Sequence, residues 1–177
     1  MEDRALPANV DELSASILKT ALTIEDFGID FYSRMSECVA EQKGAALLRS
    51  LADDEREHKA ILEKQLDQIS QSIDISKVQP MGEFLSILPD NVFVPPPEGT
   101  CLLLEDEIAA LEKGIAVEII SKKMYEAAIS KVQDQKVRST LQELAEWEGK
   151  HREILEENLR VLRLGGSWYG YGPILEG

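Results

Sequence analysis

The stretch Glu55-Arg56-Glu57-His58 lies inside a long helical pattern, and Glu148-Gly149-Lys150-His151 repeats its Glu-x-x-His spacing. Residues three apart on a helix lie on one face, a turn apart, so the carboxylate and the imidazole of each stretch can bind the same metal ion. The chain has 2 histidines, and both stand in these stretches. A metal centre in a helical bundle needs further carboxylates, which the surrounding sequence supplies.

The two halves of the chain repeat at a constant offset of 93 residues, which joins Glu25 to Glu118, Tyr32 to Tyr125, Glu55 to Glu148 and His58 to His151. Flanking leucines obey the same offset, as Leu48 and Leu141 do. Each half therefore reads as one helical hairpin. Two such hairpins, related by a pseudo-twofold axis, can close into one bundle with a ligand set from each half.

Apolar residues at steps of three and four predict four long helices, over about residues 10–39, 44–73, 103–132 and 134–164. Asn9 and Asp134 fit as N-caps of the first and fourth helices, and Gly165-Gly166 fits as a C-terminal stop. The connection around Glu41–Gly44 is short, which makes the first two helices antiparallel. The predicted fold class is all-α, an antiparallel four-helix bundle in a single domain over residues 1–177.

Two segments depart from the helical pattern. Residues 74–102 hold 5 of the 7 prolines and are predicted to cross along the bundle between two parallel helices, with a short extra helix over Met81–Leu88. The tail, residues 165–177, is aromatic and rich in glycine. It is predicted to be non-helical, yet too apolar to float freely.

Composition excludes several classes of function. The net charge of −14 repels phosphate backbones and anionic membranes, so neither nucleic acid nor a membrane is expected as a partner. An acidic start without an apolar signal core predicts a cytoplasmic protein. Cys38 and Cys101 are far apart in sequence and form no C-x-x-C, which argues against an iron–sulfur module.

Four glutamates interrupt the apolar stripes of the four helices, where an unpaired carboxylate would cost several kcal/mol. A hydrogen-bonded polar layer is the plain structural alternative, but four carboxylates meeting there would repel one another. Two divalent cations would cancel their charge. Oxygen ligands with two imidazoles suit iron or manganese, and zinc would fit without redox chemistry. The predicted metal ligands are Glu25, Glu55, His58, Glu118, Glu148 and His151.

Other residues near the motifs have two interpretations each. Tyr32 and Tyr125 lie two turns beyond Glu25 and Glu118, and are either core aromatics or catalytic residues that act as hydrogen-bond donors or redox-active phenols. Small residues one turn from these glutamates provide close helix packing or room for metals and a small oxidant; they are Ala21, Gly28, Gly114 and Ser121.

The 93-residue repeat breaks next to the motif glutamates, where Asp54 precedes Glu55 but Trp147 precedes Glu148. If the second and fourth helices are antiparallel neighbours, Asp54 can accept the free N–H of His151 from outside the metal site. An indole can only donate, so Trp147 cannot do the same for His58. The iron at His151 is therefore expected to bind more tightly, unless Asp54 merely faces solvent.

With these motifs, residues 10–164 resemble the rubrerythrin and ferritin-like superfamily of di-iron carboxylate proteins. The resemblance implies two irons between the helices, with Glu25 and Glu118 each on one metal, Glu55 and Glu148 bridging, and one histidine on each iron. It implies reaction of the ferrous pair with peroxide or dioxygen and re-reduction by an external electron-donor protein. The expected function is thus a rubrerythrin-like di-iron oxidoreductase.

Two departures from the rubrerythrin pattern keep other functions open. The sequence has neither the length nor the cysteines for an appended rubredoxin module, and Ser121 stands where many members carry a further glutamate. A ferroxidase or iron-binding protein without a separate substrate is one alternative, and a non-catalytic metal-bound interaction module is another.

The apolar surface of the tail and the crossover exceeds what one bundle can cover, which predicts a homodimer.

Overall fold

The computed structural model describes residues 10–85, 100–101 and 103–170. Four long helices dominate it: α1 (Val10–Cys38), α2 (Gln42–Ser70), α4 (Leu104–Ile129) and α5 (Gln135–Arg163). A 3₁₀ turn, η1 (Ile75–Lys77), and a short helix, α3 (Gly82–Leu85), follow α2. The described residues contain no strand, and each long helix begins and ends within four residues of its predicted bounds.

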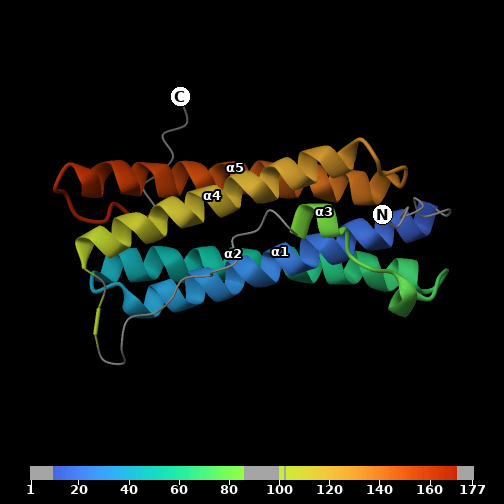
Figure 1. Ribbon diagram of the computed structural model, residues 1–177, viewed down its shortest axis with the longest axis horizontal. Coiled ribbons are helices and arrows are strands. Elements are labelled where there is room, and N and C mark those ends of the chain that lie inside the picture. Colours follow the sequence, from blue (N-terminus) through green and yellow to red (C-terminus); the bar gives the residue numbers. More distant parts are fainter. Residues whose placement is uncertain (1–9, 86–99, 102, 171–177) are drawn as a thin grey trace.

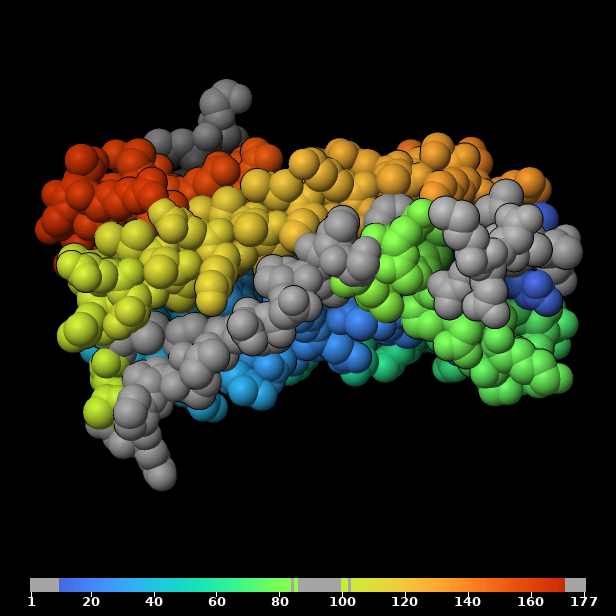
Figure 2. All heavy atoms as spheres, viewed as in Figure 1, coloured from blue at the N-terminus to red at the C-terminus, as the bar shows by residue number. Residues whose placement is uncertain are grey.

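The helices form two antiparallel hairpins, α1 with α2 and α4 with α5, packed side by side into one elongated bundle (Figure 1). Across the two hairpins, α1 packs against α4 and α2 packs against α5. The face shown in Figure 2 is divided lengthwise between the α4–α5 hairpin, in yellow to red, and the α1–α2 hairpin, in blue to green. This arrangement confirms the predicted ferritin-like four-helix bundle.

Because α2 and α4 run in the same direction, the chain must return along the bundle between them (Figure 1). The start of this connection is tied to α1, where Lys19 Nζ donates to the carbonyls of Ile75 and Val78, and Ser16 Oγ donates to that of Gln79. Within the predicted short helix over Met81–Leu88, residues Gly82–Leu85 form α3. Residues 86–99 and 102 lie outside the described residues, so the Pro-rich crossover stays a prediction.

Local capping follows the sequence at both ends of α5. Asp134 accepts hydrogen bonds from the backbone N–H groups of Lys136 and Val137, at 2.8 and 3.0 Å, and so caps the helix as predicted. At the other end Gly165 has a φ of 76°, a conformation that glycine adopts without steric cost. The predicted cap at Asn9 lies outside the described residues.

A layer of buried polar residues divides the hydrophobic core into two clusters. One cluster lies toward the C-terminal end of α1 and includes Phe31, Tyr32, Leu51 and Leu155. The other lies toward the N-terminal end of α1 and includes Leu18, Leu62, Tyr125 and Leu144. The four glutamates predicted as metal ligands and both histidines occupy the level between these clusters. The apolar helix faces therefore assemble the bundle on both sides of the polar layer and hold that layer away from water.

The start of the tail packs against one end of the bundle. Trp168 is 1% exposed, its Nε1 donates to Glu107 at 3.0 Å, and its ring lies directly over Gly44. Asn158 Oδ1 accepts from the backbone N–H groups of Tyr169 and Gly170, at 2.9 and 3.0 Å. Through residue 170 the tail is non-helical and docked, as its composition predicts. None of the described helices combines the length and apolar character required to cross a bilayer.

Candidate metal centre

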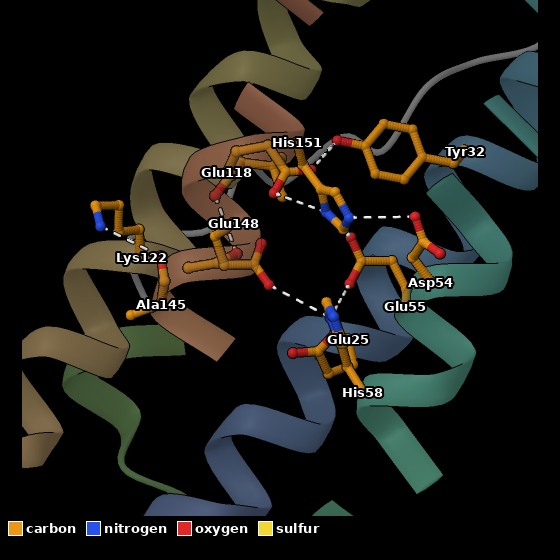
Figure 3. A network of polar contacts seen from close by, with 12 residues as sticks. Glu25, Tyr32, Asp54, Glu55, His58, Glu118, Lys122, Ala145, Glu148 and His151 are labelled. Atoms are coloured by element: carbon orange, nitrogen blue, oxygen red, sulfur yellow. Dashed lines mark hydrogen bonds and ion pairs between the residues drawn. The ribbon is translucent and has the colours of Figure 1, made fainter. Parts of the chain in front are cut away.

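Each long helix contributes to one buried group of six ionisable side chains at the middle of the bundle (Figure 3). α1 carries Glu25 and α4 carries Glu118, while the i, i+3 spacing on α2 and α5 places one glutamate and one histidine on the same inward face. All six side chains are at most 4% exposed. The structure thus brings together all the residues predicted as metal ligands: Glu25, Glu55, His58, Glu118, Glu148 and His151.

The six residues form two overlapping clusters that could each hold one cation. The first is made by Glu25, Glu55, His58 and Glu148, and the second by Glu55, Glu118, Glu148 and His151. Within each cluster the potential ligand atoms lie within 4.8 Å of one another. Glu55 and Glu148 belong to both clusters, as carboxylates that bridge two metals must.

Both imidazoles direct Nδ1 toward these carboxylates. His58 Nδ1 lies 3.1 Å from Glu55 Oε2, 3.4 Å from Glu25 Oε2 and 3.6 Å from Glu148 Oε1. His151 Nδ1 lies 3.3 Å from the other oxygen of Glu55 and 3.7 Å from Glu118 Oε2. The two carboxylate oxygens of Glu55 therefore face different histidines, and a cation beside each histidine would contact a different oxygen of the same group.

Several potential ligand atoms are buried without a hydrogen-bond partner: Glu25 Oε2, Glu118 Oε2, Glu148 Oε1 and His151 Nδ1. Buried polar atoms are normally satisfied, because leaving one unpaired costs about 1–3 kcal/mol. All four atoms lie at the clusters, where each can offer a lone pair to a cation once protons leave the site. The donor set of oxygens and imidazole nitrogens fits iron, manganese or zinc.

Without a bound metal, protonation of the buried side chains reduces the repulsion among the carboxylates. Burial, and then the charge of Glu55, raise the pKa values of Glu25 and Glu148 well above the usual range of a glutamate. Burial acts to lower the pKa of His58, but the carboxylates of Glu25 and Glu55 raise it to about 9. Glu55 shifts the other way: burial opposes its ionisation, yet hydrogen bonds from His151 and His58 lower its pKa. Cations would have to displace these protons.

The two predicted catalytic tyrosines reach across the bundle to the opposite hairpin. The Tyr32 hydroxyl on α1 donates to Glu118 Oε1 on α4, and the Tyr125 hydroxyl on α4 donates to Glu25 Oε1 on α1. Both phenols are fully buried, and burial together with the neighbouring carboxylate raises the pKa of each. Each phenol therefore stays protonated and holds a candidate ligand in place. Their catalytic role stays a prediction.

Asp54 and Trp147 occupy matched positions beside the site, as the repeat requires. Asp54 Oδ2 lies 3.4 Å from Nε2 of His151, on the side of the ring away from the carboxylate cluster. Trp147 is 45% exposed and lies beside both imidazoles, with ring centroids 6.1 Å from His58 and 6.4 Å from His151. Proximity to both rings was missed because it depends on the approach of α5 to α2.

The small residues near the site serve two different purposes. A Cβ atom at Gly28 would lie 3.2 Å from Cγ of Glu55, so this glycine leaves space for a carboxylate that both clusters share. A Cβ atom at Gly114 would instead meet the rings of Phe31 and Tyr32, at 3.2 and 3.5 Å. Gly28 thus matches the interpretation as room for the site, and Gly114 matches close packing.

Comparison with known proteins agrees with this geometry. The family model described as Rubrerythrin matches residues 16–159. Among solved structures, a hypothetical protein from Pyrococcus furiosus matches with a TM-score of 0.68 and 18% sequence identity, over 94% of this chain and 98% of that chain. At this identity the likeness shows the fold alone. A search of curated proteins found no match. Because the family model covers most of the chain and both Glu-x-x-His motifs, the chain belongs to the rubrerythrin family.

Proposed function

We propose that this protein is a di-iron oxidoreductase that reduces peroxide or dioxygen and is reset by an external electron-donor protein. The observation that carries the proposal is the pair of buried clusters that share Glu55 and Glu148, because it would place two cations side by side. Membership of the rubrerythrin family supports the same function. Iron is the metal we propose, and manganese or zinc could occupy the same donor set.

In this proposal Glu25 and His58 would hold one metal, Glu118 and His151 would hold the other, and Glu55 and Glu148 would be shared by both. When bound, ferrous iron supplies the electrons that reduce the oxidant. The protein positions the ligands: the phenols of Tyr32 and Tyr125 hold one oxygen of Glu118 and Glu25 and leave the other oxygen for metal. The apolar clusters above and below exclude bulk water from the site.

The first experiment is anaerobic reconstitution with Fe²⁺ followed by elemental analysis and peroxide titration. We expect two irons per chain, rapid oxidation by peroxide, and sustained peroxide consumption when a reductant and a mediator are supplied. Glu148→Gln should lose the second iron, whereas Glu146→Gln, an exposed neighbour on the same helix, should keep both. One iron or fewer in folded protein would refute the metal centre.

Turnover distinguishes this function from the iron-handling alternative. A ferroxidase would oxidise added Fe²⁺ and accumulate more than two irons per chain without consuming peroxide catalytically. An interaction module would bind metal with neither behaviour. One turn after Glu118 this chain has Ser121, where many members of the family carry a glutamate. Turnover with peroxide is therefore the measurement that decides between peroxidase activity and iron handling.

We also propose that the protein forms a homodimer. Leu103 and Leu164 are 72% and 76% exposed and lie at the same end of the bundle, where α4 begins and α5 ends. Large apolar side chains with this exposure favour a partner surface. Sedimentation at micromolar concentration should give twice the chain mass of 19.8 kDa. A monomer under these conditions would contradict the proposal.

A further inference from the structure

The two candidate metal positions differ in one respect outside their ligands. Each position has one histidine, one unshared glutamate and the two shared glutamates. Each unshared glutamate accepts a hydrogen bond from a tyrosine of the opposite hairpin. These features follow the 93-residue repeat and are the same at both positions, so they do not make the two metal affinities differ. The repeat is broken at Asp54 and Trp147, which stand immediately before the shared glutamates.

On the His151 side the outer ring nitrogen faces a carboxylate. Nδ1 of His151 points into the cluster, and Nε2 lies at an ion-pair distance of 3.4 Å from Asp54 Oδ2 on the neighbouring helix α2. Nε2 is buried and makes no hydrogen bond, so this carboxylate is the acceptor within its reach. The His151 ring is 1% exposed, while the Asp54 side chain is 30% exposed. Asp54 thus meets the outer edge of a buried ring from a partly solvated position (Figure 3).

On the His58 side the matched position offers no acceptor. The carboxylates close to the His58 ring are those of Glu25, Glu55 and Glu148, and each makes its shortest contact with Nδ1. In the described part of the chain, no carboxylate outside the cluster reaches this ring. Its neighbour at the pseudo-equivalent position is Trp147, whose plane is inclined at 56° to the imidazole. An indole N–H donates and cannot accept, so Trp147 cannot receive a proton from the outer nitrogen.

We propose that the two positions bind divalent metal unequally: the His151 cluster is the tight position and the His58 cluster the exchangeable one, because Asp54 supports one imidazole and Trp147 cannot support the other. The inference rests on the metal centre proposed above. It adds that Asp54 is a positioning residue, and that the lack of an acceptor at the matched position, Trp147, leaves the other imidazole unsupported.

The physical reason lies in the imidazole. A histidine that binds metal through Nδ1 must carry its proton on Nε2. A carboxylate that accepts this N–H selects that tautomer, orients the ring and increases the electron density on the metal-binding nitrogen. Loss of such a partner typically lowers metal affinity by about 10–100-fold. Because both positions share Glu55 and Glu148, effects on the shared carboxylates alter both affinities and do not create this difference.

The test is stepwise titration of metal-free protein with Co²⁺, followed by visible absorption and calorimetry. The parent should bind two Co²⁺ in two unequal steps. His151→Ala should remove the tighter step and His58→Ala the weaker one, which assigns the steps to the clusters. Asp54→Ala removes the acceptor and should weaken the tighter step by about 10–100-fold, while leaving the weaker step in place. Asp53→Ala is the matched control, because it removes the same side chain and charge from an exposed neighbour on α2.

A gain of affinity provides the complementary test. Trp147→Asp places an acceptor at the matched position and should tighten the weaker step, so that the two affinities converge. Trp147→Phe supplies no acceptor and should leave the two steps unequal. Gln142→Glu adds the same charge at an exposed site on α5 and should not make the affinities converge.

Two equal steps in the parent, or equal effects of Asp54→Ala and Asp53→Ala, would overturn the inference while leaving a two-metal centre in place. Binding of fewer than two Co²⁺ by the folded parent would overturn the centre itself and this inference with it. The outcome does not depend on catalysis, so a protein that binds two unequal metals without consuming peroxide would contradict the proposed oxidoreductase and retain the inequality.

Discussion

The hydroxyl group of Tyr32 donates a hydrogen bond to Oε1 of Glu118, which lies on the other hairpin, 86 residues further along the chain. The pseudo-symmetric bond from Tyr125 to Glu25 runs in the opposite direction between the same two helices. The two bonds link α1 and α4 on both sides of the candidate metal centre. They couple the orientation of the unshared carboxylates to the packing of the hairpins.

The first prediction concerns this link. Tyr32→Phe removes the hydroxyl and leaves a buried carboxylate oxygen of Glu118 without its donor. Hydrogen bonds to charged groups contribute about 1.5–3 kcal/mol, so we expect the free energy of unfolding to fall by about that amount. Urea denaturation of the metal-bound protein measures the change. Tyr169→Phe is the control, because Tyr169 is 51% exposed and should change stability by less than about 0.5 kcal/mol.

The second prediction concerns pH. Glu25, Glu148 and His58 all have raised pKa values in the metal-free fold, through burial and Glu55 for the two acids, and through Glu25 and Glu55 for the histidine. A group whose pKa is higher in the folded state than in the unfolded state stabilises the fold at pH values below its unfolded-state pKa. This stabilisation is lost as the pH rises through the folded-state pKa. For His58 the window lies between its ordinary value of 6.5 and about 9.

Metal-free protein should therefore lose on the order of 1–3 kcal/mol of unfolding free energy between pH 6 and pH 9. The lowered pKa of Glu55 acts in the opposite sense, but only in acid below its ordinary value of 4.5. Thermal melts with chelator across this range measure the effect, and Glu148→Gln should flatten it. Added metal should stabilise more at pH 9 than at pH 6, because fewer protons must be displaced. A stability that rises with pH without metal would contradict this.

The third prediction uses two helical glycines beside the glutamates that both candidate clusters share. Replacing a helical glycine by alanine usually stabilises a protein by about 0.5–1 kcal/mol. Gly149→Ala should show this gain, because the nearest atom to its new Cβ would be Lys122 Nζ at 3.8 Å. Gly28→Ala should lose the gain and weaken metal binding, because its Cβ would press on Glu55 at 3.2 Å. Melting curves and Co²⁺ titration of both variants give the comparison; equal metal affinities would refute the role of Gly28.

The fourth prediction concerns the docked tail. Trp168→Ala should lower the free energy of unfolding by about 3–5 kcal/mol, because it empties a fully buried site over Gly44 and removes the donor to Glu107. Both metals should still bind, since the centre lies at the middle of the bundle. Tyr169→Ala keeps the backbone bonds to Asn158 and should change stability little. Chemical denaturation checks both variants, and similar losses in the two would mean that the tail contributes only through its backbone.

The sequence alone was sufficient to predict the four long helices and to identify the candidate metal ligands. Helix positions follow from apolar residues at steps of three and four, and the Glu-x-x-His spacing places both side chains on one helix face whatever the tertiary structure. The 93-residue repeat then pairs Glu25 with Glu118 before any fold is known. These are consequences of backbone geometry, which acts within a few residues.

The tertiary structure decided which groups meet across hairpins. Sequence placed Tyr32 and Tyr125 on the right helix faces, but the choice of Glu118 and Glu25 as their acceptors depends on how α1 crosses α4. The burial of Trp168 over Gly44 likewise has no periodic signal, because a tail finds its site through shape. The contact between Asp54 and His151 required α2 and α5 to pack antiparallel at one particular register. Register between helices is determined by the packing of many side chains at once, and no local pattern encodes it.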